Sequence, residues 1–243
     1  MVKRHERVTV TLLLLIGMCS VTLDGQISSG ERPSDNSDWW SSTRSPEGIK
    51  GEKIQYREIA DENLQIVGVN LRSDIFQTIY ERLGHATVVQ RGDSSTWREQ
   101  VCYVDFSVPY STYLIFEHGE VNSSFYLFSE AIPWNGRDLC ARSKKPLGIL
   151  ETASGLHLGQ TPKQVVGILG QPSERRENEL RYFFEVKRKT PPDALARARV
   201  QHPELSEKQF HDDYDTYDLT VFIYAKFANS EMIYLGVSTA ETS

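Results

Sequence analysis

The chain has 243 residues, of which 39% are hydrophobic and 25% are charged, and its formal net charge at pH 7 is −6. This length accommodates one ordinary domain or two small ones. The acidic balance argues against binding to nucleic acid, whose phosphates need clustered lysine and arginine, and against binding to an anionic membrane surface.

The N-terminus has the pattern of a secretory signal peptide. Lys3, Arg4 and Arg7 precede an apolar run from Val8 to Met18. A bilayer crossing needs about 20 apolar residues, so we expect no transmembrane span in the mature chain. Removal of residues 1–23 takes away three basic residues and one acidic residue, which moves the net charge from −6 to about −8.

Export to the periplasm or the extracellular space is therefore predicted, with two possible fates for the N-terminus. One is ordinary cleavage between Ser20 and Gly25. The other is attachment of a lipid to Cys19, which would anchor the chain to a membrane. A lipidated cysteine normally follows Gly, Ala or Ser, whereas Met18 precedes Cys19 here.

Residues 24–53 are rich in Ser, Gly, Pro and charge and contain almost no aliphatic residue. Such a segment buries too little apolar surface to offset the entropy of ordering, so we expect a flexible linker. It contains Trp39 and Trp40. Two interpretations of this pair stay open: loose packing on the folded part of the chain, or a docking peptide for a partner.

Residues 54–140 are predicted to form a first α+β unit. Ser73 or Asp74 can cap a helix that Gly84 would end. The apolar positions of this helix recur every four residues, at Ile75, Ile79 and Leu83. The strand-like runs that follow are Glu99–Phe106, Thr112–Glu117 and Phe125–Ser129.

The cysteines indicate a disulfide. If Cys19 belongs to the export signal, Cys102 and Cys140 remain as an even pair, and an oxidising compartment favours a bond between them. The alternative is a Cys102 nucleophile with His118 as its base. It needs an activated thiol, which a cysteine in the middle of a strand seldom has.

Residues 141–243 are predicted to form a second α+β unit, whose helix has the clearest local signals in the chain. Thr161 can cap it, Pro162 suits its first position, and Gln164 can complete a capping box. Gly170 can end it, and Pro172 cannot continue it. The strands that follow are expected at Leu180–Val186, Leu219–Phe227 and Met232–Val237.

An insertion, residues 187–218, separates the first two of these strands. It is expected to contain a helix from Ala194 to Val200, a turn from Ser206 to Phe210, and an acidic loop at residues 211–218. Carboxylates beside a histidine raise the possibility of a metal or small-ligand site in this loop. The spacing does not match an EF-hand, because the required Gly and Glu are missing.

The two units have the same outline. The segment from Gly68 to Gly84 corresponds to that from Gly155 to Gly170, at an offset of 87 residues before the helix and 86 after it. The second segment resembles the SmpA/OmlA-type (BamE-like) outer-membrane lipoproteins and the β-lactamase inhibitory proteins, in which a Leu-Gly-Met-Thr-like turn opens a short helix that ends in Leu-Gly-x-Pro. The matching residues are Leu158, Gly159, Gln160, Thr161, Leu169, Gly170 and Pro172, with Gln160 in place of the usual Met. The resemblance implies a tandem repeat whose two sheets join into one.

Strand alternation in the second unit predicts a sheet face that points away from its helix. This face would present aromatic and Met side chains among charges, which is typical of interface centres. Its residues are Phe183, Phe222, Tyr224, Met232 and Tyr234. The β-lactamase inhibitory proteins use such a face, so the resemblance points the same way. The linker or the insertion could instead cover these aromatics.

These patterns lead to one functional interpretation and one alternative. The sequence contains no Gly-x-Ser-x-Gly, His-Glu-x-x-His, phosphate loop or dinucleotide fingerprint, so we propose no catalytic residue, cofactor or metal. We expect an exported α+β protein that is not an enzyme and that binds a protein partner, in envelope assembly or in inhibition of a secreted enzyme. The alternative is a small-ligand or metal-dependent activity at the acidic loop 211–218.

Overall fold

The computed structural model describes residues 53–72, 75–91, 97–106, 111–119, 122–132, 134 and 136–242, and of Ile75 and Arg91 it describes the backbone alone. The predicted signal peptide and nearly all of the predicted linker, including Trp39 and Trp40, lie outside these residues. All described residues belong to one compact unit. None of its helices is long and apolar enough to span a membrane.

The described chain is a mixed α+β structure. Its first part contains a 3-10 turn η2 (Asp61–Leu64), strands β1 (Gln65–Ile66) and β2 (Val69–Asn70), helix α2 (Ile75–Leu83), and strands β3 (Val89–Arg91), β4 (Arg98–Asp105), β5 (Thr112–Gly119) and β6 (Asn122–Ser129). A connector with η4 (Arg137–Leu139) and β7 (Ala141–Arg142) follows. The second part contains α3 (Pro162–Leu169), β8 (Glu174–Arg176), β9 (Glu179–Lys189), α4 (Pro192–Gln201), α5 (Glu207–Tyr214), β10 (Thr216–Ala228) and β11 (Glu231–Thr242).

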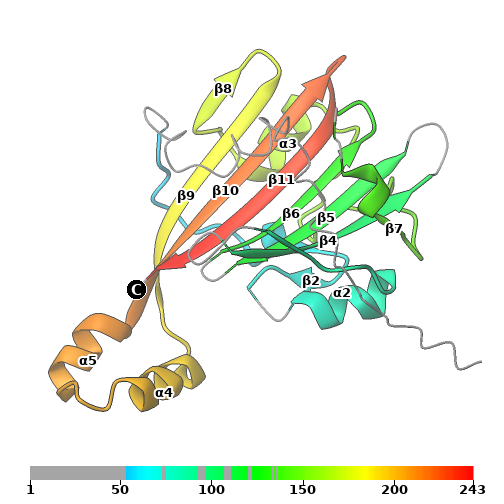
Figure 1. Cartoon of the computed structure of the whole chain (residues 1–243). Helices are drawn as coiled ribbons and strands as arrows, with labels where there is room; N and C mark the ends of the chain where they lie inside the picture. Colours follow the sequence, from blue (N-terminus) through cyan, green and yellow to red (C-terminus); the bar gives the residue numbers. More distant parts are fainter. Residues whose placement is uncertain are drawn as a thin grey trace, which may run out of the picture. The chain divides into compact units, whose positions relative to one another are not determined.

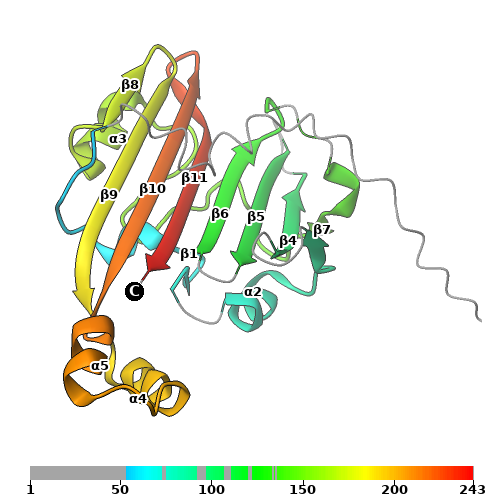
Figure 2. The same cartoon turned by 60° about the vertical axis from the view of Figure 1, so that its left-hand side comes forward.

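Nine of the strands form one sheet. Eight of them are hydrogen-bonded in the order β3-β4-β5-β6-β11-β10-β9-β8, and β7 pairs with β4. Every pairing is antiparallel except that of β7 with β4. The strands of residues 89–129 and those of residues 174–242 therefore meet where β6 pairs with β11, as Figure 1 and Figure 2 show. The single joint sheet agrees with the prediction.

Helix α3 begins and ends where the sequence predicts. The Thr161 hydroxyl accepts a hydrogen bond from the Gln164 backbone amide, and the Gln164 side chain accepts one from the Thr161 amide. Gly170 follows the helix with φ 80° and ψ −162°, a conformation that is essentially restricted to glycine. Gln160 is buried, and its amide donates a 2.8 Å hydrogen bond to the Gly155 carbonyl, which closes the loop before the helix.

Helix α2 also agrees with the prediction at its C-terminal end. It ends at Leu83, and Gly84 follows with φ 98°. The expected caps, Ser73 and Asp74, lie outside the described residues.

Both helices pack on the same face of the sheet, which we call the inner face. Helix α2 contributes Ile79 and Leu83 to a single buried cluster, and α3 contributes Val165 and Leu169. The strand members of this cluster include Tyr103, Phe116, Leu127, Tyr182, Val221 and Leu235. Residues between them along each strand point to the opposite face, which we call the outer face.

The six predicted strands are all present, and five of them are longer than expected. The insertion differs from the prediction. The helix expected from Ala194 to Val200 is present as α4. Residues 207–214 form a further helix, α5, and β10 begins at Thr216, so the prediction of an acidic loop at residues 211–218 is wrong. The Ser206 hydroxyl and the Gln209 side chain form a capping box, and Phe210 stacks on Tyr214 at 5.1 Å. The capping box therefore favours a helix, although the acidic composition of these residues is typical of a loop.

Candidate functional site

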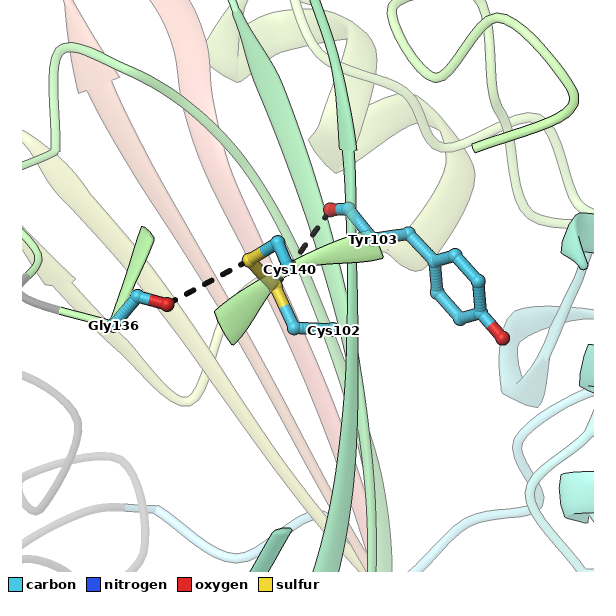
Figure 3. Close-up of a disulfide and its surroundings, with 4 residues drawn as sticks. All are labelled: Cys102, Tyr103, Gly136 and Cys140. Carbon is cyan, nitrogen blue, oxygen red and sulfur yellow. Dashed lines mark hydrogen bonds between the residues drawn. A yellow bond between two sulfur atoms is a disulfide. The ribbon is translucent and has the colours of Figure 1, made fainter. Parts of the chain in front are cut away.

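The predicted disulfide between Cys102 and Cys140 is present (Figure 3). Cys102 lies on the outer face of β4, and its Cα is 4.5 Å from that of Cys140. The bond ties the connector after β6 to this face, and β7 pairs with β4 on the side away from β5. Within the connector, the Trp134 ring lies 5.5 Å from Tyr113 and 5.6 Å from Phe128.

The outer face has rows of residues that cross the joined sheet. One row contains Cys102, Ile115, Tyr126, Gly236, Tyr224 and Arg181. The next contains Val104, Tyr113, Phe128, Tyr234, Lys226 and Glu179. The apolar members of both rows form a second buried cluster, which we call the outer aromatic cluster.

Tyr234 lies at the centre of this cluster. A Cβ built on Gly236 would lie 2.8 Å from the Tyr234 hydroxyl oxygen and 3.1 Å from its ring, so the ring lies over the bare backbone of Gly236. Its centroid is 5.4 Å from that of Tyr224, 6.1 Å from Phe128 and 6.5 Å from Tyr126. A glycine at position 236 is therefore required for this packing.

Most of the predicted partner-binding residues are buried. Phe183 and Tyr224 are each 6% exposed, Met232 is 1% exposed, and Tyr234 is fully buried. Phe222 is half-buried. The expectation that these side chains are exposed is therefore wrong for four of the five, although their binding role stays an untested prediction.

A β-bulge explains why Met232 lies on the other face. The register between β10 and β11 shifts between Lys226 and Phe227, so Phe227 pairs with Met232 whereas Lys226 pairs with Tyr234. Ile233 is the extra residue. As a result Met232 joins the inner cluster and Ile233 packs against the outer one, the reverse of what strict alternation predicts.

The Tyr224 hydroxyl lies in a buried environment on the outer face. Burial raises the pKa of Tyr224 well above its usual range, and a hydrogen bond with Glu179 adds to this effect. The Arg181 guanidinium lies 5.4 Å from the Tyr224 ring centroid. Tyr224 therefore stays a neutral phenol at physiological pH.

An open concavity lies where the two parts of the sheet meet. We call it the junction groove, and its volume is about 660 Å³. Its lining comes from both parts and from the connector: Thr112, Ser129, Ala131, Pro146, Gly148, Ile149, Leu158, Gly159, Ala228, Asn229, Glu231, Met232 and Ile233. Of these, Ile149 is 78% exposed.

The groove is mostly apolar and has one charged side chain in its lining, the exposed carboxylate of Glu231. Gly159 and Gln160 hold the loop before α3 against Met232: the Gly159 amide donates to the Met232 carbonyl and the Met232 amide donates to the Gln160 carbonyl, both at 2.8 Å. The sequence pattern did not reveal this site. Its residues are spread between positions 112 and 233, and seven of the thirteen lie outside the helices and strands.

A second, polar depression of about 380 Å³ lies beside α5, lined in part by Lys187, Asp212, Asp213 and Asp218. The described residues include no group of three or more His, Cys, Asp or Glu side chains placed to hold a metal ion. His211 instead lies between two carboxylates, with Nδ1 2.6 Å from Asp215. That hydrogen bond raises the pKa of His211.

Comparisons of this chain with family models, with curated proteins and with solved structures find no match.

Proposed function

We propose that this chain is an exported, non-catalytic protein-binding module built from two BamE-like repeats, and that it binds its partner through the junction groove. The first repeat is residues 54–140 and the second is residues 141–243. Two joined repeats are consistent with a binding site at the junction groove, because residues of both repeats line it.

Matching backbone features support the repeat. Gly68 and Gly155 precede the two helices with φ 76° and φ 87°, and Gly84 and Gly170 follow them with φ 98° and φ 80°. Positive φ values at corresponding positions indicate the same turn in each half. A helix followed by one short and three long strands also occurs in each half, with α4 and α5 inserted in the second.

A pair of buried tyrosines is a second, independent argument for the repeat. The Tyr103 hydroxyl on β4 donates a 2.7 Å hydrogen bond to the carbonyl of Gly84. The Tyr182 hydroxyl on β9 donates a 3.2 Å hydrogen bond to the carbonyl of Gly170. In each half, therefore, a tyrosine on the second strand satisfies the glycine carbonyl that ends the helix.

The observation that carries the binding role is the exposed apolar lining of the junction groove. An aliphatic side chain that is 78% exposed at the mouth of a concave, mostly apolar surface is typical of a site that receives an anchor side chain. The Glu231 carboxylate gives the mouth a negative charge. We therefore expect the partner to insert an aliphatic or aromatic side chain beside a lysine or arginine.

Site-specific cross-linking tests this proposal. The exported chain with Ile149→p-benzoylphenylalanine is irradiated in its native envelope, and adducts are compared with those from Val200→p-benzoylphenylalanine. Val200 is a matched control because it is 81% exposed and lies on α4. We expect one dominant protein adduct from position 149 that position 200 does not give.

Two substitutions then test the groove chemistry against the isolated partner. Ile149→Glu should weaken binding at least about tenfold, which corresponds to about 1.4 kcal/mol, whereas Val200→Glu should leave it unchanged. Glu231→Lys should also weaken binding, by repelling the partner's cation. Equal binding by all three variants would show that the groove is not the binding site.

A further inference from the structure

Helices α4 and α5 form a polar hairpin at the end of β9 and β10 (Figure 2). Both helices lie within the described residues, and their one buried side chain is Phe210. A short helix with so little apolar burial is marginal in water, so its order depends on its polar contacts.

A row of alternating charges joins the two helices, and we call it the charge ladder. The Arg199 guanidinium of α4 lies 2.5 Å from one carboxylate oxygen of Glu207. The other oxygen of Glu207 lies 3.7 Å from Nε2 of His211, and Nδ1 of His211 lies 2.6 Å from the Asp215 carboxylate. The last three members are four residues apart, so they lie one above another along one side of α5.

Only a protonated His211 suits both of its neighbours in the ladder. A neutral imidazole carries a proton on one ring nitrogen and a lone pair on the other. In either neutral tautomer, therefore, a lone pair faces a carboxylate, that of Glu207 or that of Asp215. The imidazolium has an N–H on each side, so it donates to Asp215 and attracts Glu207.

The C-terminal end of α5 favours the same charge. Asp212, Asp213 and Asp215 place three carboxylates at the end of the helix where the macrodipole is already negative, which is unfavourable. His211 is the basic residue of the last turn. Protonation of its ring therefore offsets these carboxylates within the helix.

We propose that α5 is a pH-sensitive helix, which is ordered against α4 when His211 is protonated and loosens when His211 loses its proton. The hydrogen bond with Asp215, followed by the charges of Asp215 and Glu207, raises the pKa of His211, and partial desolvation and Arg199 oppose this shift. A pKa that folding raises gives its full stabilisation below the unfolded value of about 6.5. That stabilisation is lost as the pH rises through the folded value. Histidine is the side chain that ordinarily titrates in this range.

The other ionisable groups around the hairpin have different surroundings. His202, in the turn after α4, stacks on Tyr214 at 5.3 Å, and its Nδ1 lies 3.4 Å from one carboxylate, that of Glu204. At the base of the hairpin, the Lys187 ammonium lies 4.0 Å from Asp218. As the second histidine of the hairpin, His202 provides a matched control.

Amide hydrogen exchange of the full chain, followed by mass spectrometry, tests the proposal at about pH 5.5 and about pH 8.5. Exchange in each peptide is expressed as protection relative to the unfolded chain, which removes the intrinsic effect of pH. We expect α5 of the native chain to be at least about threefold more protected at the lower pH. His211→Gln should remove this difference, and peptides from α3 should show none in either chain.

Two further variants separate the charge of the ring from its packing. His211→Lys should keep α5 equally protected at both pH values, because lysine stays charged throughout this range. His202→Gln should leave the pH dependence of α5 in place.

Several results would overturn the proposal. They are equal protection of native α5 at both pH values, a pH dependence that survives His211→Gln, one that disappears in His202→Gln, and α5 of His211→Lys that is as weakly protected as that of His211→Gln. Because these measurements need no partner, this inference and the binding role of the junction groove can fail separately.

Discussion

Replacement of Tyr103 by phenylalanine isolates one hydrogen bond between the sheet and helix α2. Tyr103 is fully buried, and its hydroxyl donates to the Gly84 carbonyl at 2.7 Å. Phenylalanine keeps the ring and leaves that carbonyl without its partner, which costs about 1 to 3 kcal/mol. With a urea m-value of about 2 kcal/mol/M, a loss of 2 kcal/mol lowers the midpoint by about 1 M.

Urea unfolding of the chain, followed by circular dichroism, measures this effect. Tyr182→Phe should lower the midpoint by a smaller amount, because its bond to Gly170 is longer, at 3.2 Å. Tyr56→Phe is the control, since this side chain is 75% exposed and should change nothing. If Tyr103→Phe matched Tyr56→Phe, the hydroxyl would not support the end of the helix, and one argument for the repeat would be lost.

Three further predictions concern the disulfide, a helix end and pH. Unfolded, unreduced protein should show no reactive thiol at Cys102 or Cys140, and reduction should destabilise the chain by about 4 kcal/mol for a loop of 38 residues; two labelled thiols per chain would contradict this. Gly170→Val should cost about 1 to 3 kcal/mol because φ is 80° there, and an unchanged unfolding midpoint would refute the role of this glycine. Burial raises the pKa of Tyr182 to about 12, above the value of about 10 in the unfolded chain. Its contribution is therefore complete below pH 10 and is lost as pH rises to about 12, so the slope of stability against pH in that window should become shallower in Tyr182→Phe.

Local chemistry made several features predictable from the sequence. The cap at Thr161, the glycine that ends α3 and the glycine that ends α2 act within one turn of the chain, so neighbouring residues suffice to specify them. The long strands follow from their apolar runs. The disulfide was predicted from the two cysteines that remain when Cys19 is assigned to the export signal, and that prediction did not depend on any contact.

Helix α5 shows where the sequence signals conflicted. Its acidic residues resemble a loop, but the capping box at Ser206 and the packing of Phe210 on Tyr214 determine a helix. The Ser-x-x-Gln pattern was visible in the sequence. The sequence did not show whether this pattern would outweigh the acidic composition, because the packing of Phe210 on Tyr214 is seen only in the folded chain.

Only the tertiary structure decided which surfaces are exposed. The bulge between Lys226 and Phe227 exchanges the faces of Met232 and Ile233, and no local pattern announces one extra residue in a strand. Alternation correctly placed Tyr224 and Tyr234 on the outer face, but it does not reveal what lies above that face. The junction groove likewise depends on the pairing of β6 with β11 and on loops far apart in the chain. Local sequence determines the elements of this protein, whereas its surfaces depend on contacts between residues that are distant in sequence.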